Sequence, residues 1–242
     1  MASTPLETHP GEQHGGAGSA GRLNRLRAGV LGANDGIVSV AALVVGVAGA
    51  TSAYAAILTA AVAGLVGGAI SMALGEFVSV SSQRDSERAS IARERQELQE
   101  FPDEELAELT HIYQARGLSA ETASKVAREL TAADPLRAHL DAELGIVADD
   151  LANPWAAAVA SACAFLLGGV LPVLTILLLP PSVRVGATFA VVVGALALTG
   201  ALGARLGGSA VLRPTLRVVL GGALALAATF GLGAALGTSS AI

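Results

Sequence analysis

Charged residues are scarce in this chain, and their scarcity indicates its class. Lys, Arg, Asp and Glu make up 14% of the 242 residues, whereas 52% are hydrophobic and the mean hydropathy is +0.60. A soluble domain usually has about 25% charged residues. The composition therefore excludes an ordinary soluble protein and predicts a protein of the lipid bilayer.

The sequence has one cysteine, no nucleotide-binding motif and no histidine in its apolar runs. Cys163 is the one cysteine in the sequence, and its place in an apolar run indicates a packing role rather than a disulfide. The sequence has no Gly-rich loop followed by Lys-Ser or Lys-Thr, which excludes a P-loop. Its apolar runs contain no His, so a nucleophile there would lack an evident base. We expect neither an enzyme nor a nucleic-acid-binding protein.

Five apolar runs approach or reach the roughly 20 residues that span the hydrocarbon core of a bilayer. They cover residues 28–50, 54–80, 155–179, 183–206 and 218–236. Short breaks rich in Gly, Ser or Pro separate the first run from the second and the third from the fourth, which predicts helical hairpins. None of the runs has the alternation of barrel strands. The sequence therefore predicts an all-α membrane protein with five transmembrane helices, packed through small-residue pairs such as Gly32 and Gly36.

The basic residues predict how these helices are oriented. They cluster before the first run, after the second, and between the fourth and fifth, whereas Arg184 is the one basic residue near the opposite ends. Lys and Arg in short flanking segments favour the cytoplasmic side. All three clusters fall on one side if the runs alternate in direction. We therefore expect a multi-pass membrane protein with its N-terminus in the cytoplasm and its C-terminus outside.

Residues 84–150, between the second and third runs, have the opposite composition, and we call them the acidic insert. They include 16 acidic and 8 basic residues and no run long enough to span a bilayer. The second helix is expected to continue to Glu100, and Pro102, Ser119 and Asp134 mark the starts of three further helices, the last extending toward Val147. We predict a cytoplasmic helical domain. The expected organisation is a disordered tail (1–21), two transmembrane helices (22–83), this domain (84–150) and three transmembrane helices (151–242).

Two carboxylates interrupt the first two apolar runs. Asp35 and Glu76 are the only charged residues from Ala28 to Gln83. An Asp at the centre of a membrane helix costs about 2.5 to 3.5 kcal/mol, so such residues usually face a bundle interior and mark an ion or proton path. Met72 precedes Glu76 by one helical turn and shares its face. A simpler interpretation is a polar residue paired with a neighbouring helix, but two such residues in consecutive runs favour the path.

The acidic insert repeats carboxylates at spacings that place them on one helix face. The pairs are Glu94 with Glu97, Glu105 with Glu108, and His139 with Glu143. Facing one another, they would form an oxygen-rich cage for Mg²⁺, Ca²⁺ or Mn²⁺, and the imidazole would extend the range toward Fe²⁺ or Zn²⁺. A solvated acidic face paired with nearby Arg residues explains the same spacings, so both interpretations stand on spacing alone.

Two segments resemble signatures of the vacuolar iron transporter family. They are Gly32-Ala33-Asn34-Asp35-Gly36 in the first run and the stretch from Ser71 to Gln83, which reads SMALGEFVSVSSQ, at the end of the second. The resemblance extends from about Arg25 to the end of the chain. It implies a homodimer of five-span subunits in the cell membrane that moves Fe²⁺, and often Mn²⁺, out of the cytosol in exchange for protons.

The resemblance also implies roles for individual residues. Asp35, Met72 and Glu76 match positions that line the translocation path, where a thioether beside carboxylates favours Fe²⁺. The matching metal-binding residues of the insert are Glu94, Glu97, Glu105, Glu108 and Glu143, with His139 as an additional candidate ligand.

One departure from the family concerns the last insert helix. Some members have methionines there, where this chain has His139, Leu140 and Ala142. The insert site is therefore expected to be harder, which leaves Mn²⁺ open as the substrate. Two other functions remain as alternatives: a passive divalent-cation channel, and a membrane-anchored metal sensor or scaffold.

Overall fold

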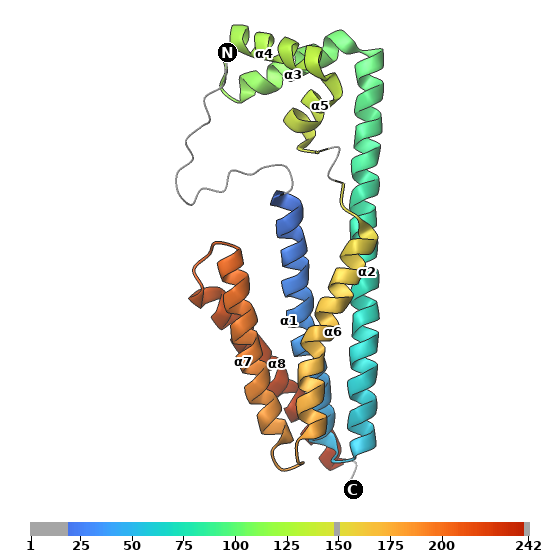
Figure 1. Ribbon diagram of the computed structural model, residues 1–242, viewed down its shortest axis with the longest axis vertical. Helices are drawn as coiled ribbons and strands as arrows, with labels where there is room; N and C mark the ends of the chain where they lie inside the picture. The colour runs from blue at the N-terminus through green and yellow to red at the C-terminus, as the bar shows by residue number, and fades with distance from the viewer. Residues whose placement is uncertain (1–18, 148–150, 240–242) are drawn as a thin grey trace, which may run out of the picture. The chain divides into compact units, whose positions relative to one another are not determined.

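The chain is helical, as its composition predicts. The computed structural model describes residues 19–147 and 151–239, and within these ranges it contains helices and connecting loops but no strand (Figure 1). Most of the predicted disordered tail, residues 1–18, lies outside the described residues. Helix α1 (Ser19–Ala50) already includes the last three residues assigned to that tail.

Five helices are long and apolar enough to cross a membrane. They are α1, α2 (Tyr54–Glu100), α6 (Pro154–Leu178), α7 (Arg184–Leu206) and α8 (Leu212–Ser239). Each corresponds to one of the five apolar runs, although α8 begins at Leu212 rather than near Val218. The side chain of Asn153 caps α6 by accepting the backbone N–H of Trp155 (3.0 Å). These helices support a multi-pass membrane protein.

The described residues form two compact units. The first, the membrane unit, is built from Asn24–Ser86 and from Ala152 onward. The second, the insert unit, is built mainly from Glu87–Leu151. Helix α2 runs without interruption through Ser86 and Glu87, so its apolar first part belongs to the membrane unit and its polar last part to the insert unit.

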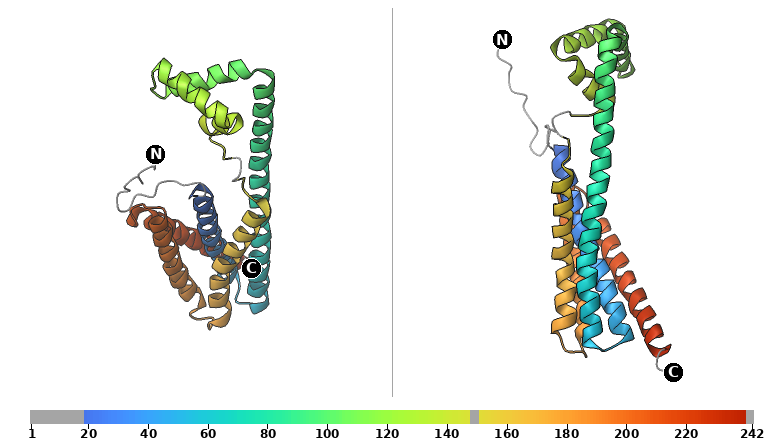
Figure 2. Two further views of the ribbon diagram at one scale, coloured as in Figure 1. Left: turned by 45° about the horizontal axis from the view of Figure 1, so that its top comes forward. Right: turned by 90° about the vertical axis from the view of Figure 1, so that its right-hand side faces the viewer.

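Glycine allows two other helices of the membrane unit to approach α1 closely. A Cβ atom at Gly36 would collide with the main chain of Phe165 on α6, and one at Gly233 on α8 would collide with the carbonyl of Gly46 on α1. In lipid, such small residues allow the packing that drives helix association. Helix α6 lies beside α7, and α7 beside α8 (Figure 2). The close approach predicted at Gly36 is therefore confirmed.

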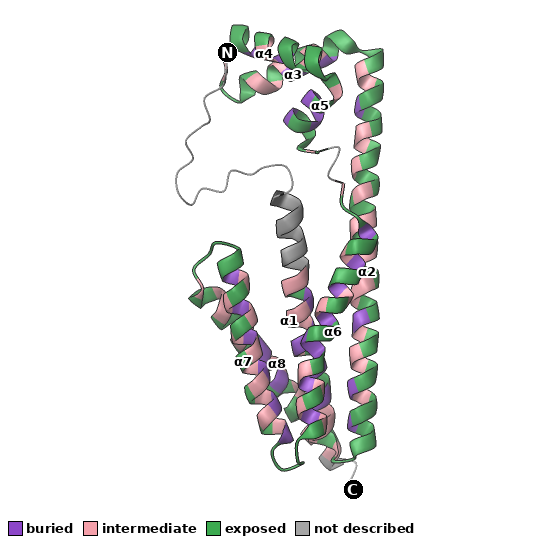
Figure 3. Ribbon diagram, in the orientation of Figure 1, coloured by how far each residue is buried: buried purple, intermediate pink, exposed green. Residues whose placement is uncertain are grey.

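Buried side chains line the inner faces of the membrane unit (Figure 3). One cluster joins Val44 of α1 to α2 and α6 through Phe165. A second joins α1 to α7 and α8 through Leu196 and Leu226. Large side chains also cover an outer face of α2 at every fourth residue from Tyr54 to Val78, with exposed fractions of 37% to 64%. A helix that is apolar on its outer as well as its inner face suits contact with lipid or with a second subunit.

The insert unit begins its helices where the sequence predicts. Helix α3 (Pro102–Ala115) has Pro102 at its first position, Ser119 caps α4 (Ala120–Ala133), and Asp134 caps α5 (Pro135–His139). The expected continuation to Val147 is wrong. Helix α5 passes directly into one π-helical turn, η1 (Leu140–Leu144), which ends because Gly145 adopts the left-handed conformation (φ 62°).

Candidate metal centre

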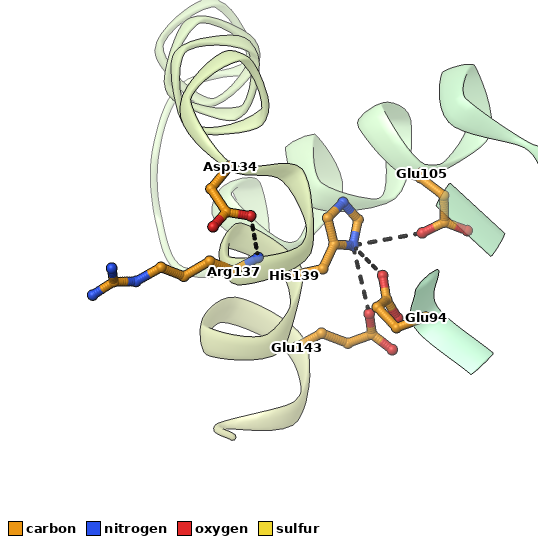
Figure 4. Close-up of polar contacts among 6 residues, drawn as sticks. All are labelled: Glu94, Glu105, Asp134, Arg137, His139 and Glu143. Atoms are coloured by element: carbon orange, nitrogen blue, oxygen red, sulfur yellow. Dashed lines mark hydrogen bonds and ion pairs between the residues drawn. The ribbon is translucent and has the colours of Figure 1, made fainter. Parts of the chain in front are cut away.

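Four elements of the insert unit bring carboxylates and one imidazole together (Figure 4). Glu94 comes from α2, Glu105 from α3, His139 from the end of α5, and Glu143 from η1. All three carboxylates lie around Nδ1 of His139. This nitrogen is 3.0 Å from Oε1 of Glu94, 3.5 Å from Oε2 of Glu105 and 3.7 Å from Oε2 of Glu143.

The centre is buried on one side and partly open at Glu143. The exposed fraction of the side chain is 0% for His139, 4% for Glu94, 10% for Glu105 and 31% for Glu143. Acidic side chains are almost never fully buried unless they are paired. Within the described part of the chain, no Lys or Arg forms an ion pair with these three glutamates. The cluster therefore carries negative charge that a cation would neutralise.

His139 and Glu94 lie at a separation that suits an ion pair and also suits two ligands of one cation. The two atoms are 3.0 Å apart, yet neither has a hydrogen-bond partner among the described residues. Ligand atoms about 2.1 Å from one cation lie roughly 3.0 Å apart in octahedral and roughly 3.4 Å apart in tetrahedral coordination. The contacts of Glu94 and Glu105 with His139 match these separations. The described residues contain one group of three or more metal-type ligands, formed by Glu94, Glu105 and His139.

Two carboxylates of the centre, Glu94 and Glu105, have raised pKa values. Glu94 lies beyond the apolar part of α2, about 21 Å along the helix from Val80 at 1.5 Å per residue. Burial, followed by the negative charges of Glu143 and Glu105, raises the pKa of Glu94 from 4.5 to about 7. Burial and the charge of Glu108 also raise the pKa of Glu105, while His139 lowers it. Near neutral pH, a cation would therefore compete with a proton for the oxygens of Glu94.

A cavity of about 220 Å³ adjoins the cluster and collects the remaining predicted glutamates. Glu97 is half-buried and Glu108 is exposed. A water molecule occupies about 30 Å³ in the liquid, so the cavity can hold a cation with several of its waters. Its lining residues are Ser90, Arg93, Glu94, Glu97, Glu105, Glu108, Glu143 and Leu144.

The three residues expected to line the membrane path lie in the membrane unit, where each is half-buried. Helices α1 and α2 form an antiparallel hairpin in which a Cβ atom at Gly64 would meet Leu43. Along α2, Glu76 lies one helical turn beyond Met72. Neither carboxylate belongs to a group of three metal-type ligands among the described residues. This membrane position therefore has fewer ligands than the insert.

Two polar contacts beside Asp35 were not predicted. The hydroxyl of Ser39 donates a hydrogen bond to Oδ1 of Asp35 (2.6 Å), and its spacing of four residues could have indicated it. The hydroxyl of Thr199 on α7 donates to Oδ1 of Asn34 (2.5 Å) across 165 residues of sequence. No local signal could have revealed the second bond. The sequence predicted His139 only as an additional candidate ligand, whereas in the structure three carboxylates surround its Nδ1.

Comparison with known proteins identifies the family. The model of the VIT family matches residues 26–234. The chain is 45% identical to the vacuolar iron transporter of Acanthamoeba castellanii, over 92% of this chain and 82% of that protein. It is 39% identical to vacuolar iron transporter homolog 1 of Oryza sativa subsp. japonica, over 90% and 76% of the two chains. Identity to vacuolar iron transporter homolog 1 of Arabidopsis thaliana is 37%, over 90% and 86%. The chain therefore belongs to the VIT family.

Proposed function

We propose that this protein transports Fe²⁺, and also Mn²⁺, out of the cytosol in exchange for protons. The observation that carries the proposal is the buried cluster of Glu94, Glu105 and His139, whose ligand atoms face one another. Members of the VIT family are transporters and not enzymes. The relatives with the highest identities quoted above are named for iron transport, which supports iron as the substrate.

The first step is capture of the ion by the acidic insert, which in this proposal is a cytoplasmic domain of residues 84–150. Glu94, Glu105 and His139 hold the cation, Glu143 closes the open side, and Glu97 and Glu108 line the entrance cavity. Carboxylates suit Mn²⁺, and an imidazole extends the preference to Fe²⁺. The absence of Met from this cluster favours a site that accepts both ions.

The second step passes the ion along the membrane unit by way of Asp35, Met72 and Glu76. Asp35 on α1 supplies a carboxylate, and Met72 and Glu76, one turn apart on α2, supply a thioether and a second carboxylate. A homodimer with this path at its axis would double the number of ligands. The exposed apolar row on α2 from Tyr54 to Val78 is consistent with a surface against lipid or a second subunit.

Exchange with protons follows from competition for the same oxygens. A carboxylate that releases a cation takes up a proton, so inward proton movement resets the path for the next ion. The basic clusters assign the N-terminus and the acidic insert to the cytoplasm and the C-terminus to the outside. In this proposal the protein lies in the cell membrane, where this orientation makes the transport an export from the cytosol.

Flux measurements on the purified full-length protein in liposomes test the proposal. Anaerobic Fe²⁺ uptake is recorded against a pH gradient, together with proton movement. We expect Asp35→Asn to abolish Fe²⁺ flux while Mn²⁺ binding to the insert persists. Glu105→Gln should slow uptake at low Fe²⁺ concentration, whereas the matched variant Glu104→Gln, which changes an exposed carboxylate one residue earlier, should not.

Three results would contradict parts of this proposal. Wild-type flux in Asp35→Asn would remove Asp35 from the path. Fe²⁺ flux without proton movement would indicate a passive channel. Metal binding without any flux would indicate a membrane-anchored sensor or scaffold.

A further inference from the structure

We propose that Arg116 is a positioning residue that holds Glu143 in the metal centre, an inference that rests on the metal-capturing role proposed for the insert. Arg116 follows the last residue of α3, the helix that carries Glu105. Its guanidinium reaches the turn that carries Glu143, so one side chain connects two of the segments that supply ligands.

The contact is made to the main chain next to Glu143. Nη2 of Arg116 donates a hydrogen bond to the carbonyl oxygen of Ala142. The guanidinium carbon also lies 5.4 Å from the centroid of the Tyr113 ring, at a distance where a cation is attracted to the face of an aromatic ring. Tyr113 packs against the same small hydrophobic core as Ala142. The Arg116 side chain is therefore held near both α3 and η1.

The carbonyl of Ala142, in the middle of η1 (Leu140–Leu144), lacks the main-chain donor that a continuing α-helix would supply. In an α-helix it would accept the N–H of Ile146, but Ile146 donates to the carbonyl of Leu140 instead (2.9 Å). The N–H of Gly145 also donates to Leu140. Among the described residues, no main-chain N–H outside the helices donates to Ala142. Arg116 therefore satisfies a carbonyl that the end of η1 leaves open.

Glu143 depends on such support more than the other ligands do. Its side chain is 31% exposed and lies 3.7 Å from His139, whereas Glu94 is 4% exposed and lies 3.0 Å away. Gly145, two residues later, adopts a positive φ that only glycine adopts readily, so the chain changes direction there. Without the bond from Arg116, the turn that carries Glu143 would lose its polar tie to α3.

Mn²⁺ binding to the full-length protein, measured by calorimetry in detergent, tests this role. We expect Arg116→Gln to weaken Mn²⁺ binding about tenfold, as is usual when a residue that orients a metal ligand is lost. Arg116→Lys, which keeps the charge and a donor, should recover part of the loss. Arg128→Gln is the matched control and should leave the affinity unchanged, because Arg128 bonds to Ser124 one turn back on its own helix (2.6 Å).

The double variant Arg116→Gln/Glu143→Gln separates positioning of Glu143 from a general structural role. We expect it to bind Mn²⁺ as Glu143→Gln alone does, because Arg116 would then have no ligand to hold. Equal losses from Arg116→Gln with and without Glu143 would overturn the inference, and so would unchanged affinity in Arg116→Gln. If Arg116→Gln does not fold, Arg116→Lys is measured instead, in the wild-type protein and in Glu143→Gln. Equal losses in the two proteins, or unchanged affinity in the first, would again overturn the inference. Failure of the wild-type protein to bind Mn²⁺ would overturn the proposed function as well, whereas the other two results concern Arg116 alone.

Discussion

Metal binding to the insert should weaken about tenfold between pH 8 and pH 6. Burial and the neighbouring charges of Glu143 and Glu105 raise the pKa of Glu94 to about 7. The ionised fraction of this carboxyl therefore falls from about 0.9 at pH 8 to about 0.1 at pH 6. Because a cation binds the ionised form, its apparent affinity falls by the same factor, which corresponds to about 1.4 kcal/mol.

Calorimetric titration of the full-length protein with Mn²⁺ at pH 6, 7 and 8 measures this change. Repeating the titration at pH 7 in buffers of different ionisation enthalpy should reveal about half a proton released from Glu94 for each ion bound. Glu94→Gln should bind more weakly at pH 8 and show a flatter pH profile, whereas Glu104→Gln should keep the wild-type profile. A Mn²⁺ affinity that is constant from pH 8 to pH 6 would show that protonation of Glu94 does not control binding. The same would follow if Glu94→Gln kept the wild-type dependence of affinity on pH.

The same pKa shift predicts the opposite trend for the stability of the metal-free protein. Since the folded-state pKa of Glu94 lies above its ordinary value of 4.5, the folded state binds more protons than the unfolded state between these values. The associated stability is present at low pH and is lost as the pH rises through 7. We expect the free energy of unfolding with chelator present to be about 1 kcal/mol higher at pH 6 than at pH 8. Glu94→Gln should remove this difference.

Three further variants test the specificity of the centre and the packing of the membrane unit. His139→Gln should weaken Fe²⁺ binding more than Mn²⁺ binding in parallel anaerobic titrations, because imidazole contributes most to the softer ion. Thr199→Val should lower the free energy of unfolding by about 1 kcal/mol through loss of its bond to Asn34, and the melting temperature would report it. Gly36→Ala should lower the free energy of unfolding by about 1 to 3 kcal/mol, because the new Cβ would collide with the main chain of Phe165. Gly75→Ala has open space around its Cβ and should be neutral or slightly stabilising in the same assay.

The helix starts of the insert could be predicted because their signals are local. Pro102 has no N–H to lose at the first position of α3, and Ser119 and Asp134 accept the free N–H groups of the helices that follow them. The continuation of α2 to Glu100 was predictable for the same reason, since no Gly or Pro lies between Gly75 and Pro102. Such features require only a few neighbouring residues.

The π turn and the depth of His139 could not be predicted, because neither has a local signal. His139 becomes fully buried only when α2 and α3 pack around the end of α5, and helical spacing alone fits a solvated face equally well. The bond between Asn34 and Thr199 likewise depends on how α7 packs against α1. Periodicity fixes which residues share a face of one helix, but it does not specify which faces of distant helices meet.

If the proposed metal centre binds an ion, its charge and its ligand types would each affect which ion it selects. Glu94, Glu105 and Glu143, when ionised around a neutral His139, carry three negative charges. A divalent ion reduces this net charge to about −1, whereas K⁺ or Na⁺ leaves about −2 in a largely buried place, where uncompensated charge is costly. Charge alone does not separate Fe²⁺ and Mn²⁺ from Mg²⁺ and Ca²⁺, which also bind carboxylate oxygens. The imidazole of His139 provides that second distinction, because the alkaline-earth ions prefer oxygen ligands and transition metals accept nitrogen.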